Sequence, residues 1–590
     1  MRKICAAVFA LSLLVAAVPA AAQGRRAPAP APDSRLNHER RVEDLLARMT
    51  IEEKIDLIGG VNDFFIRGVS RLGVPRLKMA DGPAGVRNFG PATAMPAGIA
   101  LAATWNPALV ERAAREIGRD ARAKGVHFLL GPGVNIYRAP MNGRNFEYYG
   151  EDPYLAARLA VGYIRGVQSQ GVAATVKHLL GNNSEFDRHR TDSVIDERTM
   201  REIYLPAFEA AVREAQVGAV MNAYNLVNGI HMSQHGYLNT DVTKGEWGFD
   251  GIMMSDWNAT YDGVGAAVGG LDLEMPSGAH MNRETLLPAI NAGKLSVATI
   301  DDKVRRILRT AARFGWLDRE QTDLSIPRYN REGRRVALEA AREGTVLLKN
   351  EGGLLPLAKG KIKSVAVIGP NAYPAVPLGG GSGRTEPFAA VSLLEGLSDQ
   401  LDESASVHYA RGLQTQGEMA AETRFTTTAT GGQPGLRAEY FANAELRGDP
   451  AVTRTEPPIN FGRQARSFPE QTLSSRWTGY YVPQAAGLYE VFASSTGEEG
   501  GFYRLFVDDK LVLDSWDASN ALAGLATLTL DAAPHKIVLE QRPNKRAARL
   551  GTRMQLGIVR HGSMVSEEAK QLAARADVVV LAAGFDPGTE

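Results

Sequence analysis

The chain has 590 residues, of which 44% are hydrophobic and 23% charged, a composition that excludes disordered, collagen-like and integral membrane proteins. At roughly 100–200 residues per domain, this length predicts three or four domains. Lys and Arg number 67 against 66 Asp and Glu, so the chain lacks the basic field of a nucleic-acid-binding protein. Its single cysteine, Cys5, excludes a disulfide scaffold, a cysteine-based zinc site and an iron–sulfur protein.

Residues 1–22 have the pattern of a secretory signal peptide. Arg2 and Lys3 precede an apolar run to Val18 that is too short to span a bilayer, and small residues follow up to Ala22. Residues 23–34, rich in Pro and Ala, predict a polyproline-type linker. We therefore expect a secreted or periplasmic protein with no membrane contact after signal cleavage, in preference to a protein with a retained membrane anchor.

Residues 35–331 alternate short β-branched runs with longer amphipathic stretches, the rhythm of a parallel sheet with crossover helices. The predicted strands are Leu77–Ala80, Val126–Leu130, Ala173–Val176, Ala219–Asn222 and Gly251–Met254, and the predicted helices include Pro107–Lys124 and Glu197–Ala215. Each strand ends in a polar cluster, as in a (β/α)8 TIM-type barrel, where functional groups stand at the carboxyl ends of the strands. No G-x-G-x-x-G follows a strand, which disfavours a doubly wound nucleotide-binding sheet.

The rest of the chain predicts an α/β/α sandwich interrupted by an all-β module. Residues 332–412 form the first part of the sandwich, with a helix at Arg335–Glu343 and a strand at Val365–Pro370. Residues 413–560 lose the helical period and show alternating strands such as Leu488–Ala493, Tyr503–Val507 and Lys536–Gln541. Residues 561–590 continue the sandwich incompletely, with a helix near Ser566–Ala576 and a strand at Val578–Leu581.

Five polar clusters beside the predicted strand ends supply the candidate site residues. They are Asp81-Gly82-Pro83, Gly143-Arg144-Asn145-Phe146-Glu147, Lys177-His178, Tyr224-Asn225 and Ser255-Asp256-Trp257. Carboxylates accept hydrogen bonds from sugar hydroxyls, Arg, Lys and His donate them, and Trp offers a flat face to a sugar ring. Taken singly, Asp81 is equally well a turn residue. Arg144 with its acidic neighbours could form a surface ion-pair network, but its aromatic, glycine-rich setting favours a substrate pocket.

No motif of a metal, nucleotide or serine-hydrolase site competes with these clusters. The chain has no H-E-x-x-H and no G-x-S-x-G at a strand–helix turn, and the run Gly379–Gly383 lacks the Lys-Ser/Thr of a phosphate loop. We therefore expect no metal and no cofactor. A mouth lined by carboxylates, basic groups and aromatic rings favours a glycosidase, in which two carboxylates flank the scissile bond.

Over residues of about 40 to 400, and again from about 560, these ordered motifs resemble glycoside hydrolase family 3, the β-glucosidase family. The resemblance implies a retaining enzyme without cofactor, built as a barrel followed by an α/β/α sandwich and acting on an oligosaccharide or β-glucoside. It implies that Asp256 is the nucleophile. It also implies a first sugar subsite that contains Asp81, Arg144, Lys177, His178 and Tyr224, and we add the neighbouring Trp257 to the binding residues.

Further details of the resemblance narrow the specificity. Asp in place of Glu at position 81 resembles members that accept hexoses more than xylosidases. Lys177-His178 continues without the second histidine of the N-acetylglucosaminidase branch, which disfavours that branch. The acid/base of many members is a glutamate in a sandwich loop. The matching loop here ends at Glu590, which is either the acid/base or an acidic neighbour just before it.

The all-β module resembles a PA14 domain on the segments Leu436–Phe441 and Leu505–Lys510. Such modules occur inserted in the sandwich of some β-glucosidases and border the outer subsites. The segment Ser495–Glu499 lacks the Asp-Asp pair of calcium-binding adhesins, so the resemblance implies that the module shapes the entrance to the site.

The sequence thus predicts a retaining, exo-acting β-glycosidase, with β-glucosidase as the first choice. The alternatives are a β-glycosidase for another sugar, such as a xylosidase or galactosidase, and a carbohydrate-binding protein with an inactive barrel. Linkage, aglycone preference and oligomeric state stay open. Because only one helix and one strand follow the β module, we expect the natural chain to extend beyond Glu590 and these 590 residues alone to be catalytically impaired.

Overall fold

The computed structural model describes residues 32–185, 187–358, 360–401, 403, 405–461, 468–495, 501–516, 524–543 and 554–586. The predicted signal peptide, most of the predicted linker and Glu590 lie outside these ranges. Helix α1 (Pro32–Arg48) includes the last three residues assigned to the linker, so that prediction ends too late. Across the described ranges, no helix combines the length and the apolar character needed to cross a bilayer.

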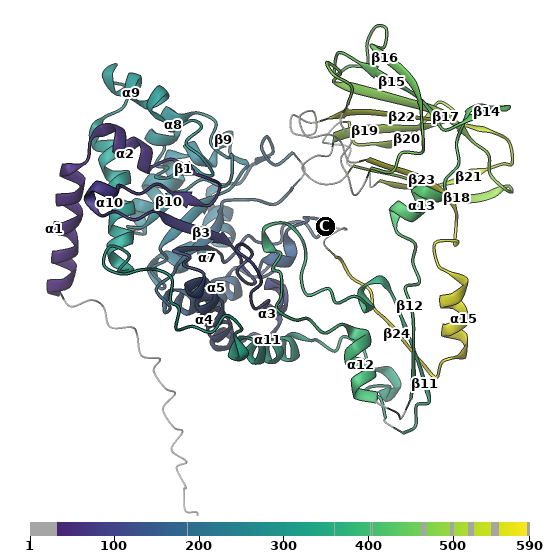
Figure 1. Cartoon of the computed structure of the whole chain (residues 1–590), viewed down its shortest axis with the longest axis horizontal. Helices are drawn as coiled ribbons and strands as arrows, with labels where there is room; N and C mark the ends of the chain where they lie inside the picture. Colours follow the sequence, from purple (N-terminus) through teal and green to yellow (C-terminus); the bar gives the residue numbers. More distant parts are fainter. Residues whose placement is uncertain are drawn as a thin grey trace, which may run out of the picture.

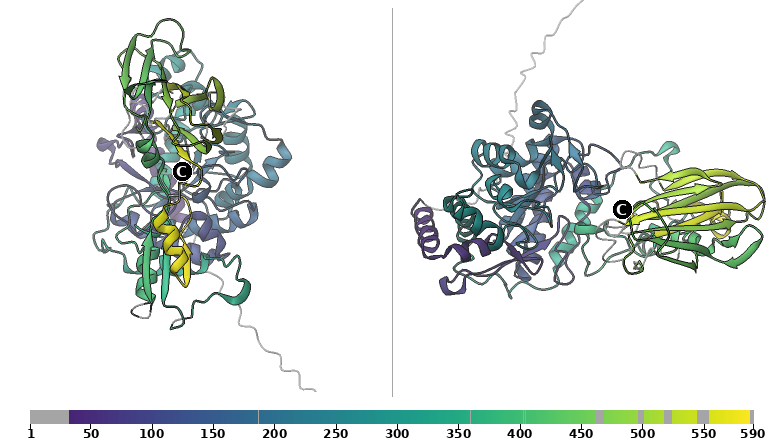
Figure 2. Two further views of the ribbon diagram at one scale, coloured as in Figure 1. Left: turned by 90° about the vertical axis from the view of Figure 1, so that its right-hand side faces the viewer. Right: turned by 90° about the horizontal axis from the view of Figure 1, so that it is seen from above.

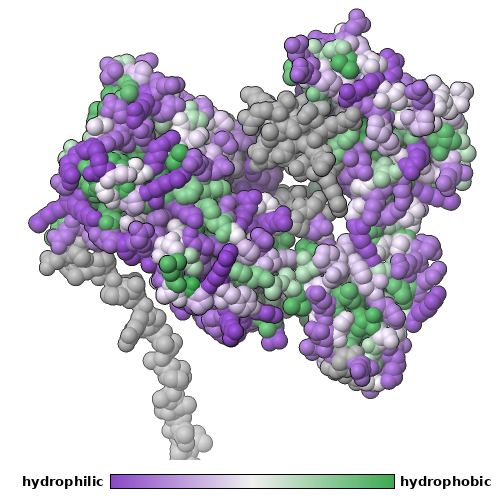
Figure 3. All heavy atoms as spheres, in the orientation of Figure 1, coloured by the Kyte–Doolittle hydropathy of each residue, from purple (hydrophilic) through white to green (hydrophobic). Residues whose placement is uncertain are grey.

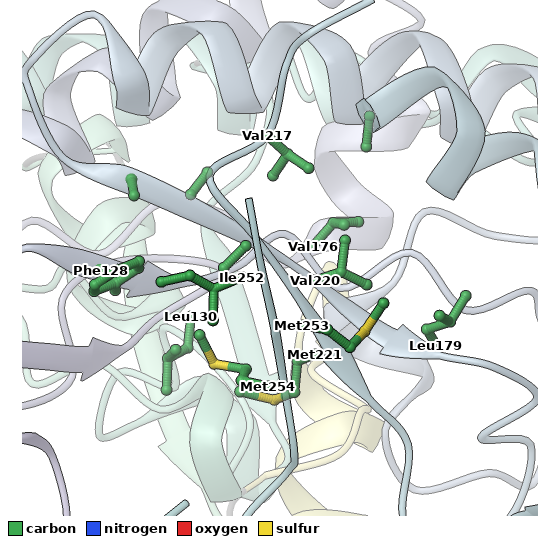
Figure 4. Packing of buried hydrophobic residues seen from close by; sticks show 14 of the residues in the cluster. Phe128, Leu130, Val176, Leu179, Val217, Val220, Met221, Ile252, Met253 and Met254 are labelled. Atoms are coloured by element: carbon green, nitrogen blue, oxygen red, sulfur yellow. The ribbon is translucent and has the colours of Figure 1, made fainter. Parts of the chain in front are cut away.

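The first unit is built on five parallel strands (Figure 1). In spatial order they are β3 (Leu77–Asp81), β4 (Phe128–Leu130), β5 (Ala173–Leu179), β7 (Ala219–Asn222) and β10 (Ile252–Met254). Each overlaps a predicted strand, because buried parallel strands are short continuous apolar runs that are visible in the sequence. Their side chains, among them Val176, Val220 and Met253, pack together in the core of this unit (Figure 4).

The sheet closes into a ring, but not through a regular eightfold repeat. Strands β1 (Gly60–Val61) and β2 (Phe65–Ile66) form an antiparallel hairpin, and β2 pairs antiparallel with β3. Isolated bridges from Met254 to Leu273 and from Gly59 to Glu274 then join β10 back to the start of the hairpin. The predicted (β/α)8 barrel is therefore confirmed only as a barrel-like α/β domain.

The physical reason for this departure is the turn between β1 and β2. Asn62 and Asp63 adopt left-handed backbone conformations, with φ of 50° and 65°, which Asn and Asp tolerate better than most residues. A tight turn of this kind joins antiparallel strands, whereas parallel neighbours need a crossover of a dozen or more residues. The turn therefore replaces the helix that a regular barrel places between its first two strands.

Helices surround the parallel strands and begin at clear sequence signals. They include α2 (Ile51–Leu57), α3 (Gly98–Ala103), α4 (Pro107–Ala123), α5 (Pro153–Gln168), α7 (Pro206–Arg213), α8 (Gly263–Val268), α9 (Arg283–Asn291) and α10 (Val297–Arg313). Asn106 and Asp152 cap α4 and α5 by accepting a hydrogen bond from a backbone N–H, and each precedes a proline. The helix predicted at 197–215 is divided into α6 (Glu197–Thr199), a π-helical turn (Met200–Tyr204) and α7, because Pro206 has no N–H to continue the ladder.

The second unit is a three-layered α/β arrangement. Helix α11 (Arg331–Gly344) leads to a parallel sheet of order β12 (Ser406–Ala410), β11 (Ser364–Ile368) and β24 (Val578–Leu581). Alternate residues of β11 face opposite sides: Val365 and Val367 pack towards α12 (Leu393–Leu401), and Ala366 and Ile368 pack towards α15 (Glu567–Arg575).

Apolar side chains are exposed on this second unit. They include Leu347, Leu348, Leu354, Val579 and Leu581. Figure 3 shows hydrophobic colour over the lower right part of the molecule, where Figure 1 places β11, β12 and β24. Within the described residues β24 pairs on one side only, which makes it an edge strand of the sheet.

An all-β module lies between β12 and β24 in the chain and forms a separate body of strands (Figure 2). One sheet contains β13 (Thr426–Thr428), β14 (Gly431–Pro434), β15 (Leu436–Phe441), β16 (Val452–Glu456), β17 (Ser474–Tyr481), β19 (Gly501–Val507), β20 (Lys510–Asp514) and β22 (His535–Pro543). The other contains β18 (Gly487–Ser495), β21 (Leu525–Leu530) and β23 (Met554–Arg560), and α13 (Gln416–Glu422) packs on β23. Buried Trp477, Tyr440 and Leu505 belong to the common core.

Burial of His127 makes the stability of the barrel-like unit depend on pH. His127 precedes β4, its Nδ1 accepts a hydrogen bond from the backbone N–H of Lys78 at 2.9 Å, and its ring packs edge-on against Trp316. Burial, assisted by nearby positive charges, lowers the pKa of His127 to about 3. Below its unfolded pKa of about 6.5, only the unfolded chain binds the proton, so stability is lost as the pH falls from about 6.5 towards 3.

We expect His127→Gln to flatten this dependence by at most about 1.4 kcal/mol per pH unit. The free energy of unfolding in denaturant, measured between pH 3.5 and 7, tests this expectation. His408→Gln, at an exposed position, is the matched control and should leave the slope unchanged. An unchanged slope in the His127 variant would show that His127 is not the group responsible.

Candidate active site

The carboxyl ends of the parallel strands bring the candidate residues into one mouth. Asp81 is the last residue of β3, Lys177 and His178 lie near the end of β5, Tyr224 follows β7, and Asp256 follows β10. All five are buried, with exposed fractions of 7% or less. Strand ends of a parallel sheet converge on one edge, which explains why residues up to 175 positions apart meet here.

The carboxylate of Asp256 stands at the centre of this group. Its Oδ2 lies 3.4 Å from Nε2 of His178, and its Oδ1 accepts a hydrogen bond from the backbone N–H of Trp257 at 2.7 Å. The side chain of Tyr224 faces the same carboxylate, and burial beside this negative charge raises the pKa of Tyr224. Tyr224 therefore keeps its hydroxyl proton, which it can donate to Asp256.

The backbone around Asp256 is clamped by the segment 272–275. The Oγ of Ser255 accepts a hydrogen bond from the N–H of Met275 at 2.9 Å, and Ser255 N–H donates to the carbonyl of Leu273 at 3.0 Å. Two residues further back in β10, the N–H of Met253 donates to the carboxylate of Asp272 at 2.9 Å. The two acids of segment 271–276 thus hold backbone in place: Asp272 accepts from Met253 N–H, and Glu274 accepts from Met281 N–H.

His178 is held as a neutral imidazole in one orientation. The backbone N–H of His178 donates to Oδ1 of Asn135 at 2.9 Å, and the backbone carbonyl of His178 accepts from Nδ2 of Asn135 at 2.8 Å. The ring Nδ1 lies 3.3 Å from the hydroxyl of Tyr148. Burial, together with the positive charges of Arg144 and Lys177, lowers the pKa of His178 far below its ordinary value. A neutral ring has one donor and one acceptor nitrogen, which suits a hydroxyl group.

Asp81 lies between two cations. Its Oδ2 accepts a hydrogen bond from Arg87 at 2.6 Å, and its backbone N–H donates to Oδ1 of Asn88 at 2.8 Å. Burial raises the pKa of Asp81, while Lys177 and Arg87 oppose that rise. Asp81 therefore presents a buried carboxylate that accepts a hydrogen bond from Arg87.

Arg144 connects the mouth to the second unit. Arg144 precedes the 3₁₀ turn Asn145–Glu147, and its Nε donates to Glu147 at 2.5 Å. Its Nη2 donates to Oγ of Ser382 at 3.1 Å. Burial lowers the pKa of Arg144, but Glu147 and further acidic groups more than offset this and the net shift is upwards. The surface ion-pair alternative is therefore wrong for Arg144, because the side chain is largely buried.

The glycine run at 379–383 allows this contact between the units. A Cβ atom on Gly383 would lie 2.8 Å from the ring of Phe146, so the loop approaches the mouth more closely than a larger residue would allow. The sequence excluded a phosphate loop here but gave no sign of this approach.

Sequence reasoning also missed residues that surround Tyr224. The guanidinium of Arg188 lies 3.8 Å above the Tyr224 ring and donates to Glu185 at 2.6 Å. The ring of His189 meets Tyr224 edge-on at 4.8 Å. Arg188 and His189 belong to an irregular loop after β5, where no periodic pattern marks them.

Two predicted site residues, Trp257 and Glu590, are not among the described buried residues that meet at Asp256. The ring of Trp257 is half-buried and lies 5.1 Å from that of Phe64, so one side of it packs inside the protein. Glu590 lies outside the described residues, so its part in the site stays a prediction. In the portion of the chain that the structure describes, no three His, Cys, Asp or Glu side chains gather as a metal site would require.

Comparisons with known proteins agree with this geometry. The profile of the glycosyl hydrolase family 3 N terminal domain matches residues 66–310, and that of the family 3 C-terminal domain matches residues 345–590. A β-glucosidase from Rhizobium radiobacter is 38% identical over 574 residues, which cover 92% of this chain and 67% of that protein. A β-glucosidase from Bacteroides ovatus is 43% identical over 407 residues, which cover 63% of this chain and 54% of that protein.

Two solved structures that contain glucose have the same fold. A β-glucosidase from Streptomyces venezuelae in complex with D-glucose matches with a TM-score of 0.69 and 30% identity, over 93% of this chain and 68% of that one. A β-glucosidase from Kluyveromyces marxianus in complex with glucose matches with a TM-score of 0.65 and 29% identity, again over 93% and 68%. The β-glucosidase resemblance and the barrel-like domain thus rest on independent evidence, and the chain belongs to glycosyl hydrolase family 3.

Proposed function

We propose that this protein is a retaining, exo-acting β-glucosidase that removes terminal non-reducing β-D-glucosyl residues. The observation that carries the proposal is the buried carboxylate of Asp256, which lies 3.4 Å from Nε2 of His178 and faces Tyr224 at the carboxyl ends of the strands of the barrel-like unit. The relatives named above are β-glucosidases, and two of the similar structures contain glucose. The chain spans 67% of the first relative and 54% of the second, so the proposal concerns the part of the enzyme present here.

In the proposed reaction the Asp256 carboxylate attacks the anomeric carbon of the terminal glucose. A bond forms from a carboxylate oxygen to that carbon while the glycosidic C–O bond breaks, and the leaving oxygen takes a proton from a general acid. Water then gives a proton to the same acid/base group, now deprotonated, and attacks the same carbon, which releases glucose and the free carboxylate, so the anomeric configuration is retained. We propose Glu590 for the general acid, on the resemblance of its loop alone.

The remaining residues of the mouth suit a polyhydroxylated ring. Asp81 accepts hydrogen bonds, Arg144 and Lys177 donate them, and neutral His178 does either. We assign these residues, with Tyr224 and one face of Trp257, to the first sugar subsite. Because their charges are buried and already paired or oriented, they need little rearrangement when a sugar replaces water.

Two further assignments rest on the sequence. We propose that the β module at 413–560 is PA14-like and borders the outer part of the site; its two packed sheets support a recognition module of this general kind. We also propose that residues 1–22 direct the protein to the periplasm or the exterior, on the basis of their signal-like pattern.

Asp256 is tested by trapping the covalent intermediate with a 2-deoxy-2-fluoro-β-glucoside that carries a 2,4-dinitrophenyl leaving group. This phenolate leaves without a proton, so the first step does not depend on the general acid. We expect stoichiometric release of dinitrophenolate and one fluoroglucosyl group on Asp256, located by peptide mass spectrometry. Asp256→Gly should show neither.

Asp262→Asn is the matched control, because Asp262 is exposed in the same loop and Asn can cap helix α8 in its place. It should be labelled like the unchanged protein. Labelling of another residue, or equal labelling of Asp256→Gly, would refute the assignment. A panel of nitrophenyl β-glycosides then distinguishes glucose from xylose and galactose.

Asp81→Ala should weaken the binding of sugar more than the chemical step. Loss of a charged hydrogen-bond acceptor costs about 1.5–3 kcal/mol, which predicts a Kd for glucose higher by roughly 10- to 100-fold in calorimetry. Asp318→Asn, which alters an exposed ion pair with Arg41, should leave the Kd unchanged. An unchanged Kd in Asp81→Ala would remove Asp81 from the subsite.

A further inference from the structure

A second layer of side chains joins three loops of the mouth through the hydroxyl of Tyr261. Tyr261 lies five residues after Asp256, and its hydroxyl donates to the backbone carbonyl of Tyr224 at 3.2 Å. The same oxygen lies 2.8 Å from Nδ1 of His189. A phenol has one proton, so with that proton on the carbonyl of Tyr224 the hydrogen bond to His189 must come from Nδ1–H of the imidazole. Three loops, after β5, β7 and β10, thus meet at one oxygen atom.

The ring of Tyr261 is fixed as firmly as its hydroxyl. It stacks on the imidazole of His231, with 3.7 Å between ring centres and an interplanar angle of 25°. Burial lowers the pKa of His231, so this partner ring is neutral, and it also contacts the backbone of Tyr224. Burial raises the pKa of Tyr261, which keeps its hydroxyl protonated. These contacts leave Tyr261 little freedom to rotate.

The consequence falls on Tyr224. Its ring lies beneath the guanidinium of Arg188 at 3.8 Å and beside the ring of His189 at 4.8 Å, and its carbonyl is held by Tyr261. Its own side chain faces Asp256, whose negative charge helps to raise the pKa of Tyr224. Side chains outside the sugar subsite therefore hold both the ring and the backbone of Tyr224. The positions of that ring and backbone set the direction of the Tyr224 hydroxyl.

We propose that Tyr261 and His189 are positioning residues that hold Tyr224 in the orientation in which its hydroxyl donates to the attacking carboxylate of Asp256. This inference rests on the proposed function of Asp256 as nucleophile. Neither Tyr261 nor His189 needs to touch the sugar; both act through Tyr224, so we expect their loss to slow attack by Asp256 more than it weakens the binding of glucose. A displaced Tyr224 would take its hydroxyl away from Asp256 and let the carboxylate rotate away from the line of attack.

The variant Tyr261→Phe removes the hydroxyl and keeps the stacked ring. We expect the rate of trapping by the dinitrophenyl fluoroglucoside to fall about tenfold, the loss that one hydrogen bond in the transition state predicts. The concentration of half-maximal trapping rate and the Kd for glucose should change by a clearly smaller factor than the trapping rate. Tyr154→Phe, at a tyrosine 73% exposed on the surface, is the matched control and should be unchanged.

His189 supplies the rescue that separates positioning from general loosening of the fold. His189→Asn keeps an N–H donor near the place of Nδ1 and should stay within about threefold of the unchanged protein. His189→Leu should lose about as much as Tyr261→Phe, and the double variant should lose little more, because both changes break the same link.

The outcomes separate this inference from the function on which it rests. If the unchanged protein is not labelled at Asp256, the proposed function and this inference both fail. If it is labelled and Tyr261→Phe reacts at the same rate, the inference alone is overturned. It is also overturned if Tyr261→Phe weakens the binding of glucose instead of slowing attack, or if His189→Asn is as slow as His189→Leu.

Discussion

The hydrogen bonds between residues 253–258 and 272–275 are the constraint on which the barrel-like unit and its site both depend. The two segments exchange backbone bonds at Met253, Leu273 and Ser255, and Asn258 N–H donates to the carbonyl of Met275 at 3.0 Å. The same stretch closes the ring, because Glu274 N–H donates to the carbonyl of Ile58 at 2.9 Å and Gly60 N–H donates to that of Glu274 at 2.8 Å. The strand that presents Asp256 and the closure of the sheet are therefore one structural element.

The charges within this element are balanced on the side away from the mouth. Asp272 is fully buried and forms an ion pair with Lys244 at 2.6 Å. Burial lowers the pKa of nearby Lys303 to about 8, although the negative charge of Asp272 acts in the opposite direction. Removing one member of such a buried group leaves the others uncompensated, which costs more than the pair contributes. The acids of the 271–276 stretch thus maintain the geometry of the site without entering it.

The buried charges at the mouth also compensate one another, and there they form the site itself. Asp81, Arg144, Lys177 and Asp256 are all largely excluded from water, and each lies near a partner of opposite sign or a hydrogen-bond donor. Burial alone would neutralise these groups, and their mutual attraction opposes that tendency. The result is a fixed arrangement of donors and acceptors that suits hydroxyl groups in a region poor in water.

Several features of the fold were predictable because they have a local cause. The parallel strands are apolar runs, α4 and α5 begin at Asn-Pro and Asp-Pro pairs, and β11 shows its buried strand directly in Val-Ala-Val-Ile. The β1–β2 hairpin was missed because each strand has only two residues, too few to show a period. Ser382 was missed because it meets Arg144 across 238 positions of sequence, and nothing near Ser382 signals that contact.

By itself the sequence determined the five parallel strands of the first unit and the polar residues at their ends, because both follow from apolar runs and short-range motifs. It also determined that Asp81, Lys177, His178, Tyr224 and Asp256 share one edge, since parallel strands present their carboxyl ends together. Only the tertiary structure decided that His178 is neutral, that Ser382 reaches Arg144 from another unit, and that Tyr261 links three loops. These properties depend on burial and on contacts between distant loops, which no local pattern of residues encodes.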